Sequence, residues 1–366
     1  MDIKLLFEIL VSECIKNNYS DLHLNTLHKP FIRNHYGDLE NIDKVTVNWN
    51  PIETPIFTKE NIIVIIKVIA WELGFLKFQD NFELDLSYQF KDGDRFRVNC
   101  YADTSWYSIA MRKIPVEIPT IEDLWLWENI KEMCRKSKWL ILVTWPTWSG
   151  KSTNLAAMID YINSNFKKHI ITIEDPVEFG LISKKSLINQ RELWNSTHSF
   201  ANAIRAALRE DPNIIMVWEM RDAETIKSAI TLAETGHLVL STLHTNDTVQ
   251  AIDRIVDVFP AGQQDQIRMQ LAMSLIWIVS QRLLPRIDKE WRIAAREIMV
   301  ANDAIRNLII TWKTHQLYSV IEVWQKEWMV LMDKYLLVLY NKWIISKDIL
   351  KSFARDKDQI DLMLNN

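Results

Sequence analysis

The sequence predicts an α/β protein with two unlike parts. Residues 1 to about 115 alternate apolar and polar side chains at strand spacing, which is typical of antiparallel strands with one solvated face. From about residue 139, short apolar runs alternate with helical stretches. Strands that are apolar throughout predict a mostly parallel sheet covered by helices on both faces. A length of 366 residues fits two or three domains that need neither disulfides nor metals to fold.

The composition is that of a globular protein without a strong overall electrostatic field. The chain is 48% hydrophobic and 25% charged with a formal net charge of −4, which counts against a protein that coats nucleic acid or anionic membrane. Its cysteines, Cys14, Cys100 and Cys134, form no CxxC pair, so we expect free thiols in a reducing compartment. No stretch approaches about 18 uncharged apolar residues, which predicts a cytoplasmic protein without a membrane-spanning segment.

The first part, residues 1–115, is predicted to contain an antiparallel meander of three strands, with Asp92-Gly93 as the first hairpin turn. Its apolar positions are Phe82, Leu84, Leu86, Tyr88 and Phe90, then Phe96, Val98 and Cys100, then Tyr107, Ile109 and Met111. The opposite face carries Arg95, Arg97 and Arg112. Spacing alone leaves two interpretations of these arginines equally open, a solvated face or a contact with phosphate.

A linker, residues 116–138, is expected to separate this part from the second part, residues 139–366. Prolines in and beside it interrupt regular structure. In the second part, buried strands are predicted at 140–144, 170–173, 214–217 and 238–240, and helices at about 151–163, 199–210, 222–234 and 247–257. After about residue 263 the sequence predicts mainly helices, interrupted by a hairpin around 288–291.

A phosphate-binding loop is predicted where the first of these strands ends. Gly150-Lys151-Ser152-Thr153 opens the helix that follows, and consecutive backbone N–H groups of such a loop converge on phosphate. Lys151 would neutralise phosphate oxygens, and the Ser152 hydroxyl would bind Mg²⁺. The strand before and the helix after favour ATP binding over the alternative of a solvated lysine.

Two tryptophans stand in this loop where the pattern GxxxxGK[ST] requires backbone freedom. Trp145 occupies the first glycine position and Trp148 lies inside the loop, where an indole would obstruct the approach of phosphate. The chain holds only 7 glycines but 16 tryptophans, and together they approach the share of about 7% that glycine alone usually supplies. We therefore hypothesise that a codon read as glycine in the source organism, such as UGA, is written here as tryptophan.

Acidic residues follow the neighbouring strands. Glu174 and Asp175 end the second predicted strand, and Glu219 follows the third, which has the apolar character of a Walker B strand. The carboxyl ends of strands face the ligand crevice of an open α/β sheet, so these carboxylates should converge near Lys151. One would help to hold Mg²⁺ through water and another would orient the attacking water, although each alone could be a strand-end cap.

Two histidines, His237 and His244, bracket the fourth predicted strand. A histidine at a strand end can donate to a γ-phosphate and respond to its loss. Taken alone, each would more simply be a core or edge histidine. The spacing of cysteines and histidines does not predict a transition-metal site.

Together these motifs resemble the secretion ATPases of the type II secretion and type IV pilus superfamily, and most closely the PilT-like pilus retraction ATPases. The Walker A loop matches 145–153, the Asp box 172–178, the Walker B motif 214–221, the His box 234–245, and the AIRNLI motif of retraction ATPases 304–309. Residues 20–24 resemble part of the family's N-terminal domain. The resemblance covers nearly the whole chain. It implies a PAS-like N-terminal domain, a RecA-like P-loop NTPase core and a homohexamer with nucleotide between the two domains.

The resemblance also implies an activity and a set of site residues. The activity is ATP hydrolysis with Mg²⁺ that powers pilus retraction, by a protein at the inner face of the cytoplasmic membrane that acts on an inner-membrane platform protein. The implied nucleotide-binding residues are Thr147, Ser149, Gly150, Lys151, Ser152, Thr153, Asp175 and His237, and the implied catalytic residues are Glu174, Glu219, His244, Arg97 and Arg112. Ser152 and Glu219 would hold Mg²⁺, the latter through water. Either Glu174 or Glu219 could position the attacking water.

Three alternatives stay open. A pilus assembly or secretion ATPase of the same superfamily is disfavoured by the AIRNLI-like segment and by the lack of a tetracysteine module. A non-catalytic ring follows if the tryptophans of the loop are genuine. A RecA-like nucleic-acid translocase is disfavoured by the net acidity and by the lack of an obvious channel of basic and aromatic residues.

The family pattern places glycine at many of the tryptophan positions of this chain. These are Trp139, Trp145, Trp148, Trp218, Trp291, Trp312, Trp324 and Trp328, together with Trp194, Trp277 and Trp343. Random substitution would not concentrate on one replacement, which agrees with the codon hypothesis.

Overall fold

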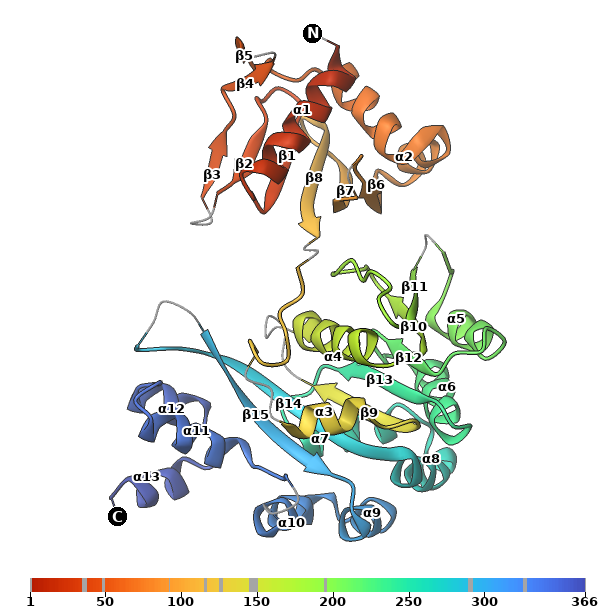
Figure 1. The fold of residues 1–366 in the computed structure, drawn as a ribbon, viewed down its shortest axis with the longest axis vertical. Coiled ribbons are helices and arrows are strands. Elements are labelled where there is room, and N and C mark those ends of the chain that lie inside the picture. The colour runs from red at the N-terminus through yellow and green to blue at the C-terminus, as the bar shows by residue number, and fades with distance from the viewer. Residues whose placement is uncertain are drawn as a thin grey trace. The chain divides into compact units, whose positions relative to one another are not determined.

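The structure is a computed structural model that describes residues 2–34, 38–47, 50–91, 93–114, 117–124, 128–144, 151–193, 196–288, 292–324 and 328–365. It divides into two compact units. Unit 1 comprises Met1–Glu117 with Pro176–Gly180, and unit 2 comprises Ile118–Asp175 with Leu181–Asn366. Figure 1 labels their helices and strands.

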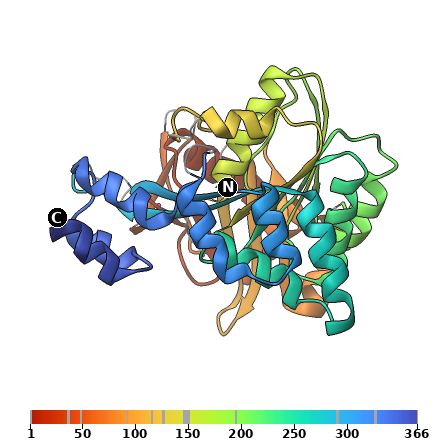
Figure 2. The ribbon, with the colours of Figure 1, turned by 90° about the horizontal axis from the view of Figure 1, so that it is seen from below.

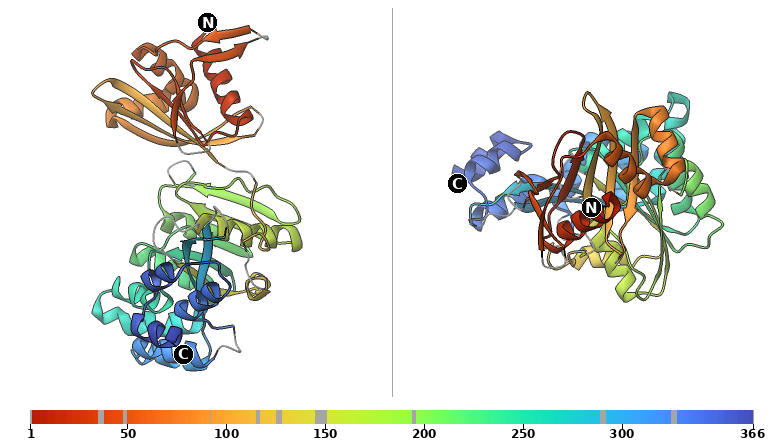
Figure 3. Two further views of the ribbon diagram at one scale, coloured as in Figure 1. Left: turned by 90° about the vertical axis from the view of Figure 1, so that its left-hand side faces the viewer. Right: turned by 90° about the horizontal axis from the view of Figure 1, so that it is seen from above.

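Unit 1 is built on an antiparallel sheet with the strand order β3-β2-β1-β8-β7-β6. Its strands are β1 (Asp21–Asn25), β2 (Phe31–Arg33), β3 (Leu39–Asn41), β6 (Glu83–Gln89), β7 (Arg95–Asp103) and β8 (Trp106–Ile114), and a separate hairpin pairs β4 (Lys44–Val47) with β5 (Asn50–Glu53). Helices α1 (Ile3–Lys16) and α2 (Lys59–Asn81) pack against each other and against the sheet. Figure 3 shows this unit from two further sides.

The predicted meander is confirmed as β6, β7 and β8, which pair antiparallel in that order. Phe96, Val98 and Cys100 of β7 are buried, as their spacing predicts, and the intervening Arg97 is exposed. Alternation of side chains along a strand is therefore sufficient to separate the core face of this sheet from its solvated face.

Unit 2 contains a seven-stranded sheet with the order β11-β10-β12-β13-β9-β14-β15 among the described residues. The strands are β9 (Trp139–Thr144), β10 (His169–Glu174), β11 (Leu187–Glu192), β12 (Ile214–Val217), β13 (Leu238–Leu243), β14 (Leu275–Pro285) and β15 (Arg292–Val300). All neighbouring pairs are parallel except β14 with β15. The mostly parallel sheet predicted from the sequence is confirmed.

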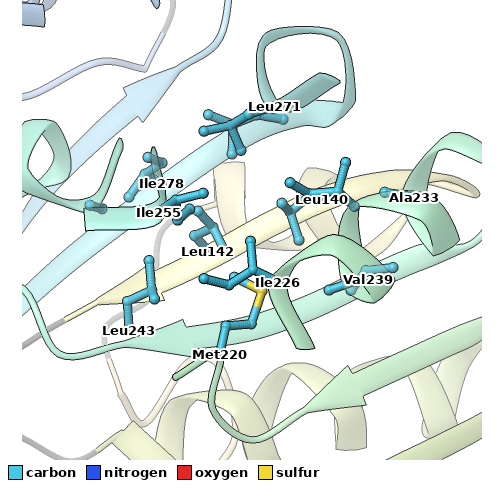
Figure 4. Packing of buried hydrophobic residues seen from close by; sticks show 14 of the residues in the cluster. Leu140, Leu142, Met220, Ile226, Ala233, Val239, Leu243, Ile255, Leu271 and Ile278 are labelled. Atoms are coloured by element: carbon cyan, nitrogen blue, oxygen red, sulfur yellow. The ribbon is translucent and has the colours of Figure 1, made fainter. Parts of the chain in front are cut away.

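Helices cover both faces of this sheet. They are α3 (Glu128–Cys134), α4 (Lys151–Asn165), α5 (Phe200–Ala207), α6 (Ala223–Glu234), α7 (Thr248–Asp257), α8 (Ala261–Ser274), α9 (Asp303–Ile310) and α10 (Leu317–Val323), with a 3₁₀ turn at Thr314–Gln316. Leu140 and Leu142 of β9 belong to the buried cluster formed with α5 to α10, whereas Ile141 and Val143 belong to the cluster formed with α3 and α4. Figure 4 shows Leu140 and Leu142 among the apolar side chains of the first cluster.

The hairpin predicted around 288–291 is confirmed, but the expectation of mainly helical structure on both sides of it is wrong for residues 275–300, because its two strands extend well beyond the turn. Strands β14 and β15 occupy most of this segment and pair from Trp277 with Val300 to Pro285 with Arg292. A short apolar run fits a buried strand and a buried helix equally well. Pairing of β14 with β9 provides the hydrogen bonds that decide for strand.

The last helices form a third part of unit 2. Helices α11 (Met332–Asn341), α12 (Lys347–Phe353) and α13 (Lys357–Asn365) share a separate buried cluster with Leu284 and Ile293 of the β14–β15 pair. Seen from below in Figure 2, these dark blue helices lie apart from the teal and blue helices α8 to α10. None of the helices in the described segments has both the length and the apolar character needed to cross a bilayer.

The alternating packing of β9 predicts a large cost for truncating one of its core side chains. Leu142→Ala should lower the free energy of unfolding by about 2 to 5 kcal/mol, because the buried side chain would leave a cavity. Urea unfolding followed by circular dichroism measures the change. Leu187→Ala, at an exposed position of edge strand β11, is the matched control and should cost much less. Equal costs at the two positions would contradict the assigned packing.

Candidate active site at the carboxyl edge of the sheet

Four parallel strands of unit 2 end at one edge of the sheet. Register pairs Ile173 with Val217, Val217 with Ser241, and Leu243 with Thr144. The residues that follow β10, β12 and β13, and the helix α4 that follows β9, therefore lie at the same edge. This is the place where an open α/β sheet binds its ligand.

Glu174 is the last residue of β10 and is buried. Its Oε1 accepts hydrogen bonds from Thr172 Oγ1 at 2.6 Å and from Gln190 Nε2 at 2.9 Å. Thr172 lies two residues earlier in the same strand, and Gln190 lies opposite it on β11. The carboxylate is thus fixed by two neighbouring strands.

Glu219 follows β12 and is only 8% exposed. Its Oε2 lies 2.6 Å from Arg221 Nη2, and its Oε1 lies 3.2 Å from His244 Nε2. The hydrogen bond with Glu219, reinforced by the charges of Glu219 and Asp175, raises the pKa of Arg221. The structure therefore brings Glu219, His244 and the exposed Asp175 into one electrostatic group, with Arg221 as its cation.

A pocket of about 400 Å³ opens beside this group. Glu219, Arg221 and His244 line one part of it, and Asp253 and Asp257 of α7 line another. Burial raises the pKa of Asp253, and the nearby Asp257 adds to the rise. The pocket therefore presents polar and ionisable groups of both signs next to the buried carboxylate.

The start of α4 lies at the same edge. Lys151 is its first residue, the buried Ser152 follows, and Thr153 is half-buried. The N-terminus of a helix of 15 residues favours an anion, because its first N–H groups have no partner within the helix. The other predicted residues of the loop, Thr147, Ser149 and Gly150, lie outside the described residues, as do Trp145 and Trp148.

His237 is the predicted nucleotide ligand that the structure does not bring to this edge. It precedes β13, and its Nδ1 lies 3.1 Å from Leu232 O and 3.2 Å from Thr235 Oγ1, at the end of α6. A parallel strand rises about 3.3 Å per residue, so the six residues of β13 separate His237 from His244 by roughly 20 Å. His237 and His244 therefore lie at opposite edges of the sheet, and contact of His237 with nucleotide stays a prediction of the family resemblance.

The predicted arginines lie in unit 1. Arg97 on β7 and Arg112 on β8 are directly opposite each other in the antiparallel register. Arg112 Nε donates to Asp21 Oδ1 at 2.7 Å, and Arg97 is exposed. Arg95 Nη2 donates to Ser87 Oγ at 3.2 Å on the neighbouring strand. Three cations therefore share one face of this sheet, and Arg112 is held by the buried carboxylate of Asp21. The role of Arg97 and Arg112 toward phosphate stays a prediction.

A buried polar network supports α4 from the β14–β15 pair. Gln281 Oε1 accepts from Asn154 Nδ2 at 2.7 Å and from Arg296 Nε at 2.8 Å. Arg296 Nη2 also donates to Leu124 O at 2.9 Å. Burial lowers the pKa of Arg296. The network connects the first turns of α4 to the segment that precedes α3.

Glu297 supports the segment that carries His244. Its Oε1 accepts from Thr248 N at 2.9 Å and from Thr248 Oγ1 at 2.7 Å, and its Oε2 accepts from Met332 N at 3.2 Å. Burial raises the pKa of Glu297, and the hydrogen bonds with Thr248 oppose this rise. Our sequence reasoning missed both Arg296 and Glu297. Their signal is an adjacent pair of opposite charges within the apolar run 293–300.

Comparison with known proteins identifies the family. Residues 95–320 match the family description "Type II/IV secretion system protein". The chain belongs to the Type II/IV secretion system protein family. This match includes the strands and helices that bring together Glu174, Glu219 and His244.

Two known proteins are similar to this chain over most of its length. A "Twitching motility protein" of Neisseria gonorrhoeae is 46% identical over 283 residues, 77% of this chain and 76% of the relative. A "Type IV pilus retractation ATPase PilT" of Pseudomonas aeruginosa is 42% identical over 351 residues, 96% of this chain and 97% of the relative. The resemblance to PilT-like retraction ATPases predicted from the motifs is confirmed.

Two solved structures share the fold. The structure described as "Crystal Structure of the Pilus Retraction Motor PilT and Bound ADP" has a TM-score of 0.85 and 38% identity, covering 97% of this chain and 99% of that one. The ATPase DotB of Legionella pneumophila has a TM-score of 0.73 and 26% identity, covering 95% of both chains. The predicted α/β fold class with a P-loop NTPase core is confirmed.

The support by Glu297 predicts a stability cost when its carboxylate is removed. Glu297→Ala should lower the free energy of unfolding by about 2 to 4 kcal/mol, because it leaves the buried donors of Thr248 and Met332 without an acceptor. Chemical denaturation measures this change. Glu322→Ala, which removes a partly exposed ion pair with Lys334, should cost at most about 1 kcal/mol. A Glu297→Ala cost no larger than that of the control would contradict the supporting role.

Proposed function

We propose that this chain is an ATP-hydrolysing motor that powers retraction of a type IV pilus. The observation that carries the proposal is the carboxyl edge of the sheet, where Glu219 lies between Arg221 and His244 close to the strand that leads into α4. Similarity over 96% of the chain to a PilT retraction ATPase supports the same activity.

The triphosphate would bind at the start of α4. Backbone N–H groups at a helix N-terminus and the ammonium of Lys151 attract phosphate oxygens. The ADP in the crystal structure of the PilT relative supports nucleotide binding by this fold. Thr147, Ser149, Gly150 and Thr153 belong to the proposed cradle through the sequence pattern.

The residues at this edge fit Mg²⁺. This ion prefers hard oxygen ligands and usually keeps several waters, with one or two protein ligands beside the substrate phosphates. Ser152 offers a hydroxyl and Glu219 a carboxylate, and the described part of the chain gathers no group of three or more His, Cys, Asp or Glu that would enclose a metal. The bound ion would neutralise charge on the phosphate oxygens.

Hydrolysis would use the two buried carboxylates. Either Glu174 or Glu219 orients the attacking water and accepts its proton, while the other acts on the ion through water. His244 and Arg221 each contact Glu219, so a change at the γ-phosphate would alter the charge balance around both. Asp175 adds negative charge beside Arg221.

Mechanical work would come from a homohexamer at the inner face of the cytoplasmic membrane. In this proposal Arg97 and Arg112 of unit 1 contact phosphate, and unit 1 rotates against unit 2 as nucleotide is bound and lost. The motion would be passed to a platform protein in the membrane. The family resemblance supports this arrangement. The face shared by the two arginines agrees with it.

Replacement of the carboxylates predicts loss of turnover with binding retained. In a chain with glycine at positions 145, 148 and 218, Glu174→Gln and Glu219→Gln should each lower kcat by about 10²- to 10⁴-fold, because a positioned general base is lost. An assay of phosphate release measures kcat, and it is repeated over a range of Mg²⁺ concentrations. The variant that also needs more Mg²⁺ identifies the carboxylate that acts on the ion.

Asp361→Asn serves as the control, because Asp361 of α13 pairs with Lys351 of α12 in the C-terminal helices, whose apolar cluster is separate from those around this edge. Its turnover should equal that of the parent chain. Hydrolysis that survives both carboxylate changes would contradict the assigned chemistry. No hydrolysis in the chain with glycine restored would favour the non-catalytic ring.

A deletion strain separates retraction from assembly. Loss of a retraction ATPase should leave pili on the cell surface and abolish their retraction and twitching. Fluorescent labelling of pili with live imaging measures both. Loss of the pili themselves would contradict the retraction assignment and favour the assembly ATPase.

A further inference from the structure

Tryptophans dominate the left-handed backbone positions of this chain. Among the described residues, ten that are not glycine have a positive φ, and six of the ten are tryptophan. The six are Trp71, Trp106, Trp139, Trp312, Trp328 and Trp343, with φ angles of 60°, 96°, 98°, 58°, 70° and 57°. A side chain on an L-residue disfavours this region, and glycine enters it freely. A bulky aromatic residue is therefore concentrated where glycine is normally needed.

The end of α11 shows what the backbone requires. The N–H of Trp343 donates to Tyr340 O at 2.9 Å, and the N–H of Ile344 donates to Leu339 O at 3.0 Å. These two bonds define a Schellman motif, in which the residue after the C-cap is left-handed and is usually glycine. In this motif Trp343 holds the glycine position, and 77% of its surface is exposed.

The end of α9 repeats the motif. The N–H of Trp312 donates to Ile309 O at 3.4 Å, and the N–H of Lys313 donates to Leu308 O at 2.9 Å. Trp312 again holds the left-handed position after the C-cap. Two helices of unit 2 thus end in the same unusual way.

The chain provides its own comparison. Helix α6 ends with the same two bonds, from Gly236 to Ala233 and from His237 to Leu232, and here the left-handed residue is glycine. Helix α1 ends likewise with Asn18, the other residue that this position favours. The four motifs share one backbone geometry, and tryptophan replaces the expected residue type in two of them.

Two tryptophans of unit 1 also have a positive φ, one inside a helix and one in a turn between strands. Trp71 interrupts α2 with φ 60° and ψ 177°, a combination that is essentially restricted to glycine. Trp106 is the fourth residue of the turn between β7 and β8 that begins at Asp103, a position where type I turns favour glycine. Neither residue is among the glycine positions that the family pattern identifies, so backbone geometry adds them independently.

One buried tryptophan shows a different conflict. Trp277 of β14 is nearly buried, and its Nε1 has no hydrogen-bond partner among the described residues. Buried indole N–H groups usually find an acceptor, since an unsatisfied donor destabilises the fold. The pairing of β14 with β9 also shifts register between Leu275 and Trp277. With glycine at this position the unpartnered donor is absent, and glycine within a strand is typical of such a bulge.

We propose that the protein made by the source cell carries glycine at these six left-handed positions, because the codon written as tryptophan is decoded there as glycine. The same decoding gives glycine at 145 and 148 and restores the loop pattern GxxxxGK[ST] before Ser152. The proposal does not depend on the proposed function, since backbone geometry and composition carry it. The competing interpretation is that the indoles make stabilising contacts, such as that of Lys59 Nζ, 3.7 Å from the ring centre of Trp106.

Peptide mass spectrometry of the protein purified from the source cell tests the proposal directly. Peptides that cover positions 71, 106, 139, 312, 328 and 343 should have the mass of glycine at each position. Tryptophan at any of these positions would overturn the proposal. The outcome is independent of ATP hydrolysis, so it distinguishes failure of this inference from failure of the proposed function.

A stability measurement tests the physical argument in recombinant protein. In the chain as printed, Trp312→Gly and Trp343→Gly should each raise Tm by about 2 to 4 °C, because the left-handed strain is removed. Trp324→Gly is the matched control, since Trp324 is also an exposed tryptophan at the end of a helix, where it is the C-cap of α10 with φ −93°. It should not raise Tm. A fall in Tm for both test variants would overturn the argument from strain.

A second background keeps the test decisive if the printed chain does not fold. Starting from a chain with glycine at all sixteen tryptophan positions, tryptophan is returned at 312, at 343 or at 324. Return at 312 or 343 should lower Tm by about 2 to 4 °C. Tryptophan returned at 324 should lower Tm less than tryptophan returned at 312 or 343. An equal effect at the three positions would contradict the proposal.

Discussion

The parallel register of β10, β12, β13 and β9 is the constraint on which the candidate active site depends. Backbone pairing fixes where each strand ends, and each strand ends in a residue or helix with a distinct chemical role. Glu174, Glu219 and His244 come from separate parts of the sequence and lie at one edge of the sheet only because those strands are aligned. The strand that leads to Glu219 is separated from the strand that leads to α4 by β13, which places His244 between them.

Two buried residues of β15 that take no direct part in the proposed chemistry stabilise the elements around the site. Arg296 and Glu297 are adjacent in β15 but bond to different elements. Arg296 is linked to α4 through Gln281. Glu297 accepts hydrogen bonds from α7 and α11. Burying two charged side chains is unfavourable unless their hydrogen-bonding groups are satisfied. The β14–β15 pair therefore acts as a rigid support whose polar residues orient the helices at the site.

Much of this arrangement follows from the sequence. Apolar runs with acidic or histidine ends predict four central strands and place Glu174, Glu219 and His244 at one edge. His237 lies at the opposite edge, since histidines at the two ends of one strand cannot share an edge, and its predicted contact with nucleotide is untested. The hairpin around 288–291 is predicted, but the extent of its strands β14 and β15 is missed, because their apolar residues fit a helix equally well and only pairing with β9 decides. Arg97 and Arg112 are correctly placed on one face of a sheet, but periodicity carries no information about what that face contacts.

The tertiary packing of unit 2 is divided into separate apolar clusters. Leu284 and Ile293 lie on the far part of the β14–β15 pair and pack with α11, α12 and α13, away from the clusters that flank β9. Packing units with few shared apolar contacts can open independently of the rest of a protein. The C-terminal helices are therefore a place where the chain can loosen, or accept insertions and new surface charges, while the parallel strands keep their alignment.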